Sequence, residues 1–325
     1  MSQVKFPALV GESPLAILAA IGTLRLIHDF VDEGARLSWD PADREPVLHS
    51  KLSSVDAVAE ELAEIVTEMP EDVVVPGGPA GFPLERIGTK GSDPMRPLPG
   101  GMADLFATLT AGLCESEVDT VAIWMGSLVT DLVFRKPAKK GEQPVGMVSQ
   151  FIAGAGQQTI ATMLEKSHES VCSHPEYLYQ ALAGWRRGEG VTGEYLDHRA
   201  IWSATDDPRG QNGKMRGVPG ATWLALMSYP LWTTTAAGKQ VRTSGWHQEK
   251  ARRGSVAELR LPLWQEPLGP AAIKALVEHP VLEGKGETKT PEAAALRLLG
   301  IFHVCCAHRR QADGGKSAGV LVPVS

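Results

Sequence analysis

The sequence predicts an α+β protein that combines helices with short antiparallel strands in two subdomains. Apolar residues recur at helical spacing in some segments and alternate with polar residues in others, and both patterns are mixed along the chain. Of the 325 residues, 43% are hydrophobic and 22% are charged, which is typical of a globular protein. A chain of this length favours about two domains, since one domain takes roughly 150 residues.

The N-terminal part predicts two helices with short strands between them. Ser13 and Pro14 precede apolar residues at helical spacing, so a helix begins there with Ser13 as its N-cap. Short strands are expected at 35–39 and 46–49, and Ser54 caps an amphipathic helix that ends near residue 69. The outer face of this second helix is acidic, which predicts an exposed surface, with partner binding as the alternative.

Residues 70–101 form a Pro/Gly-rich loop. This stretch contains seven prolines, which exclude a regular helix or strand. A loop of this length in a globular domain is usually functional or a linker. The loop contains three cations that suit the binding of an anion, which are Arg86, Lys90 and Arg96.

The rest of the chain mixes further helices and strands. Helices are expected at 102–113, 159–168, 175–187, 219–229, 270–279 and 291–299. Strands are expected at 118–125, 128–135, 146–152, 256–263, 301–307 and 320–324. The second of these strands leads into a basic turn that contains Arg135, Lys136, Lys139 and Lys140.

The two halves of the chain differ in charge. Residues 1–150 contain 12 Lys and Arg against 22 Asp and Glu, whereas residues 151–325 contain 20 against 16. We therefore expect an acidic N-terminal α+β region that contacts protein partners and a more basic C-terminal α+β region that contacts nucleic acid.

Basic residues are most concentrated between residues 209 and 253, where Glu249 is the only acid. The eight cations are Arg209, Lys214, Arg216, Lys239, Arg242, Lys250, Arg252 and Arg253. Because cations neutralise phosphates and flat rings stack on bases, we interpret the segment as a nucleic-acid-binding surface on which Trp246 presents an exposed ring. A second, weaker set of cations consists of Lys90, Arg96, Lys139 and Lys140. The alternative is a solvated loop over a tryptophan-rich core.

Catalytic motifs are incomplete in this sequence. Residues 154–159 begin like a dinucleotide-binding loop, but a threonine stands where the third glycine belongs. The Gly-Gly-Lys-Ser run at 314–317 lacks the first glycine of a phosphate-binding loop. Asp206 and Asp207 with His198 leave open a metal-dependent nuclease, although such residues in a loop more often cap turns. We therefore expect a non-catalytic protein without a cofactor or a metal.

Cysteine content and hydropathy indicate the compartment. The four cysteines are too few for a disulfide framework, and Cys305 and Cys306 are adjacent within an apolar stretch that reads as a buried strand. No apolar run reaches the roughly 18 residues that cross a bilayer, and no export signal is apparent. The sequence predicts a cytoplasmic protein that does not bind membranes.

Several short segments resemble CRISPR-associated proteins of type I-G systems, formerly called I-U. The opening GESPL at 11–15, continued by LAAIGTLRL at 18–26, is similar to the Pro-Leu pair and Ala-Leu-Gly-Leu-Leu-Arg helix of that group. ARLSW at 35–39, the Pro/Gly-rich loop VPGGPAGF at 75–82 and the Leu-Ala helix at 221–232 add to the likeness. Together these segments cover less than a fifth of the chain.

The resemblance implies a subunit of an RNA-guided surveillance (Cascade-like) complex, akin to its large subunit, in which a separate helicase-nuclease cuts the target. The implied partners are guide RNA, target DNA and other subunits of the complex, and the implied role is contact with the nucleic-acid backbone. Two alternatives stay open. One is the metal-dependent nuclease built on Asp206, Asp207 and His198, and the other is a purely structural protein-interaction subunit whose tryptophans all lie in the core.

Overall fold

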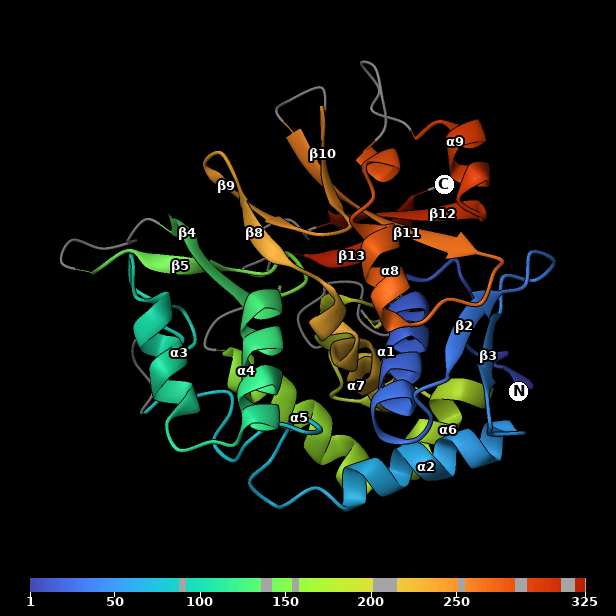
Figure 1. Cartoon of the computed structure of the whole chain (residues 1–325), viewed down its shortest axis with the longest axis horizontal. Helices are drawn as coiled ribbons and strands as arrows, with labels where there is room; N and C mark the ends of the chain where they lie inside the picture. The colour runs from blue at the N-terminus through green and yellow to red at the C-terminus, as the bar shows by residue number, and fades with distance from the viewer. Residues whose placement is uncertain are drawn as a thin grey trace.

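Helices and antiparallel sheets are both present, which confirms the predicted α+β class. The structure is a computed structural model that describes residues 1–87, 92–135, 142–153, 158–200, 215–250, 255–283, 291–310 and 319–324. Most of the helices in this part of the chain lie in the lower half of Figure 1, and the largest sheet lies above them.

The helices follow the predicted order, with one addition. The α-helices of the described residues are α1 (Pro14–Phe30), α2 (Val55–Thr67), α3 (Met102–Thr110), α4 (Glu115–Leu128), α5 (Ile160–Ser173), α6 (Glu176–Ala183), α7 (Pro219–Met227), α8 (Pro270–Val277) and α9 (Ala293–Leu298). Short 3-10 helices are η1 (Gly193–Tyr195), η2 (Tyr229–Leu231) and η3 (Pro280–Glu283).

The strands form small antiparallel sheets. One sheet has the order β1-β3-β2 and consists of β1 (Ser2–Lys5), β3 (Pro46–Ser50) and β2 (Arg36–Trp39). The largest has the order β10-β11-β12-β13 and consists of β10 (Trp246–Lys250), β11 (Ser255–Trp264), β12 (Ile301–Arg310) and β13 (Val320–Val324). The described residues also form two-stranded pairs, which are β4 (Val129–Arg135) with β5 (Val145–Val148), β6 (Gly188–Glu189) with β7 (Arg216–Gly217), and β8 (Thr234–Ala237) with β9 (Gln240–Thr243).

Helix α1 lies at the centre of the core and packs along α7, as Figure 1 shows. Every residue of α1 from Pro14 to Ile27 is buried, and so is every residue of α7. At Gly22 the two helix backbones approach so closely that a Cβ atom would lie 1.7 Å from the carbonyl oxygen of Leu224. Glycine is therefore required at this position by packing rather than by backbone torsion angles.

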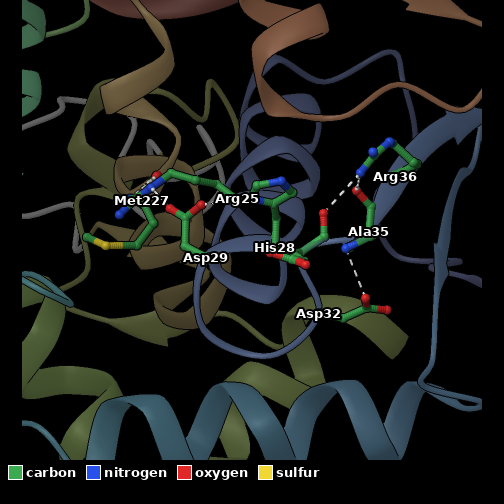
Figure 2. Close-up of polar contacts among 9 residues, drawn as sticks. Arg25, His28, Asp29, Asp32, Ala35, Arg36 and Met227 are labelled. Carbon is green, nitrogen blue, oxygen red and sulfur yellow. Dashed lines mark hydrogen bonds and ion pairs between the residues drawn. The ribbon is translucent and has the colours of Figure 1, made fainter.

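Arg25 is a charged residue inside this apolar helix pair (Figure 2). Its Nη1 donates a hydrogen bond to the carbonyl oxygen of Met227 at 2.7 Å, and its Nε donates to Asp29 Oδ2 at 3.1 Å. Its guanidinium lies 5.7 Å from the ring centroid of Trp124. Burial lowers the pKa of Arg25, and the charge of Asp29 opposes that shift. Because Met227 ends α7, Arg25 satisfies a carbonyl that the helix itself leaves without a partner.

The predicted strand at 118–125 is wrong, because these residues belong to α4. The buried residues Val121, Trp124, Met125 and Leu128 follow the spacing of one helix face. The carboxylate of Glu117 accepts a hydrogen bond from the Cys114 amide at 3.1 Å, which stabilises the start of the helix. The β-branched valines in the segment favour a strand locally, but burial of one helical face outweighs that preference.

Residues 234–250 form strands that the sequence analysis did not predict. Strands β8 and β9 are joined by the two-residue turn Gly238-Lys239, in which Gly238 has a φ of 61°. A positive φ favours glycine and suits a tight hairpin. The strands are only four or five residues long, so the alternation pattern is too short to identify them.

The core is shared by residues from both sides of position 150. Trp39 and Trp264 are buried and meet edge to face, with ring centroids 6.3 Å apart. The indole N–H of Trp264 donates to the carbonyl oxygen of Leu37 at 2.7 Å, which joins β11 to β2. Residues of the acidic region and of the basic region thus belong to one hydrophobic cluster.

Candidate functional site

Many of the predicted nucleic-acid-binding residues lie outside the described part of the chain. These are Arg209, Lys214, Arg252 and Arg253 of the main set and Lys90, Lys139 and Lys140 of the weaker set. Lys250 belongs to β10, but its side chain is not described. Arg216, Lys239, Arg242, Trp246 and Arg96 can be placed.

The three placed cations of the main set are exposed but belong to different elements. Arg216 lies on β7 and pairs with Glu189 at 3.0 Å, while Lys239 lies in the β8–β9 turn and Arg242 on β9. Arg242 pairs with Glu283. Exposed ion pairs contribute little stability, so both arginines can exchange their partners for phosphates at low cost. Lys239 and Arg242 belong to one hairpin, and Arg216 lies on a separate pair of strands.

Trp246 is buried, so the prediction of an exposed stacking ring is wrong. Its side chain is 2% exposed. The ring meets Phe151 edge to face, with centroids 5.6 Å apart, and the guanidinium of Arg309 lies 5.5 Å from its centroid. The bases of a nucleic acid have no access to this ring. The basic residues around it in the sequence made it resemble a stacking platform, but Trp246 faces the core at the start of β10.

The residues of the alternative nuclease site are only partly placed. His198 is half-buried, and burial lowers its pKa, whereas Asp206 and Asp207 lie outside the described residues. Within the described ranges, no group of three His, Cys, Asp or Glu side chains is arranged to hold a metal ion.

Three arginines converge on a small polar cavity next to the start of α5. Arg86 and Arg96 come from the Pro/Gly-rich loop, and Arg135 comes from the end of β4. The cavity has a volume of about 140 Å³, and Asp93 is the only acid among the described residues that line it. We call this the arginine cavity. Its three positive charges against one negative charge make it suited to an anion about the size of a phosphate group.

The pKa of Arg96 reflects both its burial and the charges around the arginine cavity. Burial lowers the pKa of the Arg96 guanidinium, and the positive charge of Arg135 lowers it further. Asp93 raises the pKa of Arg96 by a smaller effect. Burial also raises the pKa of Asp93, although hydrogen bonds from two backbone amides oppose that shift. An added anion would relieve the repulsion between Arg96 and Arg135.

The loop that carries Arg96 is fixed by its own polar groups. Asp93 accepts hydrogen bonds from the amide of Met95 at 3.0 Å and from the amide of Ile160 at 2.7 Å. The second contact ties the loop to the first turn of α5. The amide of Gly146 donates to the carbonyl oxygen of Pro97 at 2.7 Å, which ties the loop to β5. A segment that composition alone marks as irregular is therefore held in a defined position.

The sequence predicts anion binding by the loop cations Arg86 and Arg96, and it places Arg96 in the weaker nucleic-acid-binding set. Arg135 belongs to the expected basic turn and has no predicted binding role. Their convergence depends on the contact between the Pro/Gly-rich loop and the β4–β5 hairpin, which no sequence pattern encodes. A second cavity adjoins the first and shares Arg86 and Gln158 with it. Glu194 supplies a carboxylate to the lining of this second cavity, and no sequence motif points to it.

Comparison with known proteins adds no identification, since neither a family model nor a curated protein matches the chain. Among the helices in the described ranges, none has the length and apolar character needed to cross a membrane.

Proposed function

We propose that this chain is a non-catalytic nucleic-acid-binding subunit that contacts the sugar-phosphate backbone through the arginine cavity. Following the resemblance in the sequence, we propose that it works in the cytoplasm as part of an RNA-guided CRISPR surveillance complex. Guide RNA, target DNA and other subunits of that complex would be its partners.

The observation that carries this proposal is the convergence of Arg86, Arg96 and Arg135 on one cavity, whose described lining includes a single carboxylate. Arginine binds phosphate oxygens through paired N–H donors, and such charge-assisted hydrogen bonds are about twice as strong as neutral ones. Burial of Arg96 increases the value of that interaction, because a partly desolvated charge gains more from an anion than a solvated one does.

The surface cations support the proposal as additional backbone contacts. Lys239 and Arg242 are exposed on the β8–β9 hairpin, and Arg216 is exposed on β7. Contacts of this kind raise affinity for any sequence and weaken with salt. They fit a protein that positions a nucleic acid while base pairing to a guide reads the sequence.

Binding of labelled RNA and duplex DNA to the purified chain tests the proposal. Arg96→Gln and Arg135→Gln should each reduce affinity about tenfold or more, because each removes hydrogen bonds to a charged group. The matched control is Arg297→Gln, which removes an exposed arginine on α9. Equal affinities of the parent and both cavity variants would contradict the proposal.

The burial of Trp246 favours a second candidate, the purely structural protein-interaction subunit. Co-expression with the neighbouring genes separates the two. A structural subunit would co-purify with partner proteins and leave RNA affinity unchanged when Arg96 and Arg135 are replaced, whereas a nucleic-acid-binding subunit would lose RNA from the assembly.

A further inference from the structure

We infer that the cavity beside the arginine cavity binds a guanine base, whose phosphate group lies among Arg86, Arg96 and Arg135. The inference rests on the proposed function, and it adds a base-selective pocket to a backbone-binding site. We call this second cavity the Glu194 cavity.

The Glu194 cavity has the size and lining of a small-ligand site. Its volume is about 530 Å³, within the range of roughly 300–1,000 Å³ typical of ligand pockets. Thr162, Lys166, Ser167 and Ser170 line it from one face of α5, and Glu194 lines it from η1. Arg86 and Gln158 line both cavities, so a nucleotide can place its phosphate in one and its base in the other.

The backbone holds Glu194 in a strained conformation. Gly193, Glu194 and Tyr195 have consecutive positive φ values of 62°, 47° and 61°. Such a conformation is strained for a residue other than glycine and recurs at functional sites. The Thr192 hydroxyl accepts a hydrogen bond from the Glu194 amide at 3.3 Å, and Arg309 Nη1 donates to the Tyr195 carbonyl oxygen at 3.5 Å. These contacts fix the carboxylate at the wall of the cavity.

The hydrogen bonds of Glu194 leave acceptor capacity on its carboxylate. Gln158 Nε2 donates to Oε2 at 2.6 Å, and the Thr192 hydroxyl donates to Oε1 at 3.2 Å. A carboxylate has about four acceptor positions, so two further donors can be accommodated. Burial raises the pKa of Glu194 to about 7, which shows that its present partners do not fully offset desolvation.

Guanine is the nucleobase whose edge matches this group. Its N1–H and N2–H donors lie side by side and can face the two oxygens of a carboxylate. Adenine and cytosine each place a ring-nitrogen lone pair next to a single amino group, and uracil places one N–H between two carbonyl oxygens. Lys166, Ser167 and Ser170 offer donors for the O6 atom of guanine. A buried acceptor left without its donors makes the mismatched bases bind more weakly.

Recognition of guanine by the Glu194 carboxylate also predicts that the affinity for guanine depends on pH. The titratable or charged groups around Glu194 are Lys166 on α5, Arg86 on the loop, Tyr195 on η1, Tyr229 on η2 and Arg309 on β12. Of these groups, Lys166 lowers the pKa of Glu194 through its positive charge. The ionised carboxylate accepts from guanine, whereas the protonated acid loses one acceptor position. Affinity for guanine should therefore rise about tenfold between pH 6 and pH 8, as the ionised fraction increases.

Titration of the full chain with the four nucleoside 5′-monophosphates by calorimetry tests the inference. The parent should bind guanosine monophosphate at least tenfold more tightly than the other three at pH 8, and Glu194→Gln should abolish that preference. Arg96→Gln should weaken all four equally and preserve the preference. The matched control is Glu169→Gln, which removes an exposed carboxylate from α5 and should change nothing.

The outcomes distinguish the inference from the proposed function. Equal binding of all four nucleotides, or a preference that survives in Glu194→Gln, would overturn the base pocket and leave the phosphate site intact. No binding of any nucleotide, together with RNA affinity unaffected by Arg96→Gln, would overturn both. If Glu194→Gln fails to fold, a pH series on the parent decides through the ratio of the affinities for guanosine and adenosine monophosphate, in which the titration of the shared phosphate cancels. That ratio should rise from pH 6 to pH 8, and a constant ratio contradicts the inference.

Discussion

Replacing Trp246 with alanine should destabilise the fold without touching the nucleic-acid surface. The side chain is 2% exposed, so its removal leaves a cavity in the core. Truncation of a buried tryptophan costs about 3–5 kcal/mol. The edge-to-face contact with Phe151 adds about 0.5–1.5 kcal/mol beyond area burial, and the Arg309 guanidinium loses its aromatic neighbour. We therefore expect Trp246→Ala to lower the free energy of unfolding by an amount at the upper end of the range of about 3–5 kcal/mol.

Thermal and denaturant unfolding measure this loss directly. Trp246→Ala should melt well below the parent, and Trp246→Phe should lose less because it keeps an aromatic ring against Phe151. Trp185→Ala is the control, since that half-buried indole lies two residues beyond the end of α6 and its removal should cost less stability. RNA affinity measured below the melting temperature should equal that of the parent. An unfolding curve that coincides with the parent's, combined with weakened single-strand binding, would refute the buried role and restore the stacking one.

Two further predictions concern packing and pH. Gly22→Ala should destabilise the protein by about 1–3 kcal/mol or more, because the new Cβ meets the Leu224 carbonyl oxygen. Gly126→Ala is the control at an open position on α4 and should stabilise the protein by about 0.5–1 kcal/mol. Equal unfolding midpoints for the two variants would contradict the contact between α1 and α7. Burial lowers the pKa of His247 from 6.5 to about 4, so the unfolded chain binds more protons between these values and stability is lost as the pH falls through them. His247→Gln should reduce the fall in the free energy of unfolding between pH 7 and pH 5 by about 2 kcal/mol, whereas replacement of the exposed His279 by glutamine should not. Parallel plots of stability against pH for the parent and His247→Gln would contradict the lowered pKa of His247.

Periodicity identified the elements that are long or capped. The helix after Pro14 and the helix capped by Ser54 are present as predicted, and the Ser54 hydroxyl accepts a hydrogen bond from the Ala57 amide at 3.1 Å. Residues 118–125 show where periodicity fails, because β-branched residues with a helical burial pattern satisfy both templates over eight positions.

The site was less accessible to sequence reasoning than the fold. Charge density marked Arg96 as a binding residue, but only tertiary contacts bring Arg86 and Arg135 to the same cavity. Glu194 shows the limit more clearly, since a single glutamate in a polar segment has no motif that would indicate its burial or its positive φ. Trp246 shows the opposite error, in which proximity in sequence to cations suggested exposure.

The salt dependence of RNA binding tests the central claim, that the arginine cavity holds a phosphate group, most directly. The logarithm of the affinity falls with the logarithm of salt concentration by about 0.7–0.9 for each phosphate contact. The double variant Arg96→Gln/Arg135→Gln should show a slope shallower by about one contact than the parent, whereas Arg186→Gln/Arg297→Gln, which removes two exposed arginines elsewhere, should keep the parent slope. A cavity variant whose slope and affinity both equal those of the parent would contradict the claim.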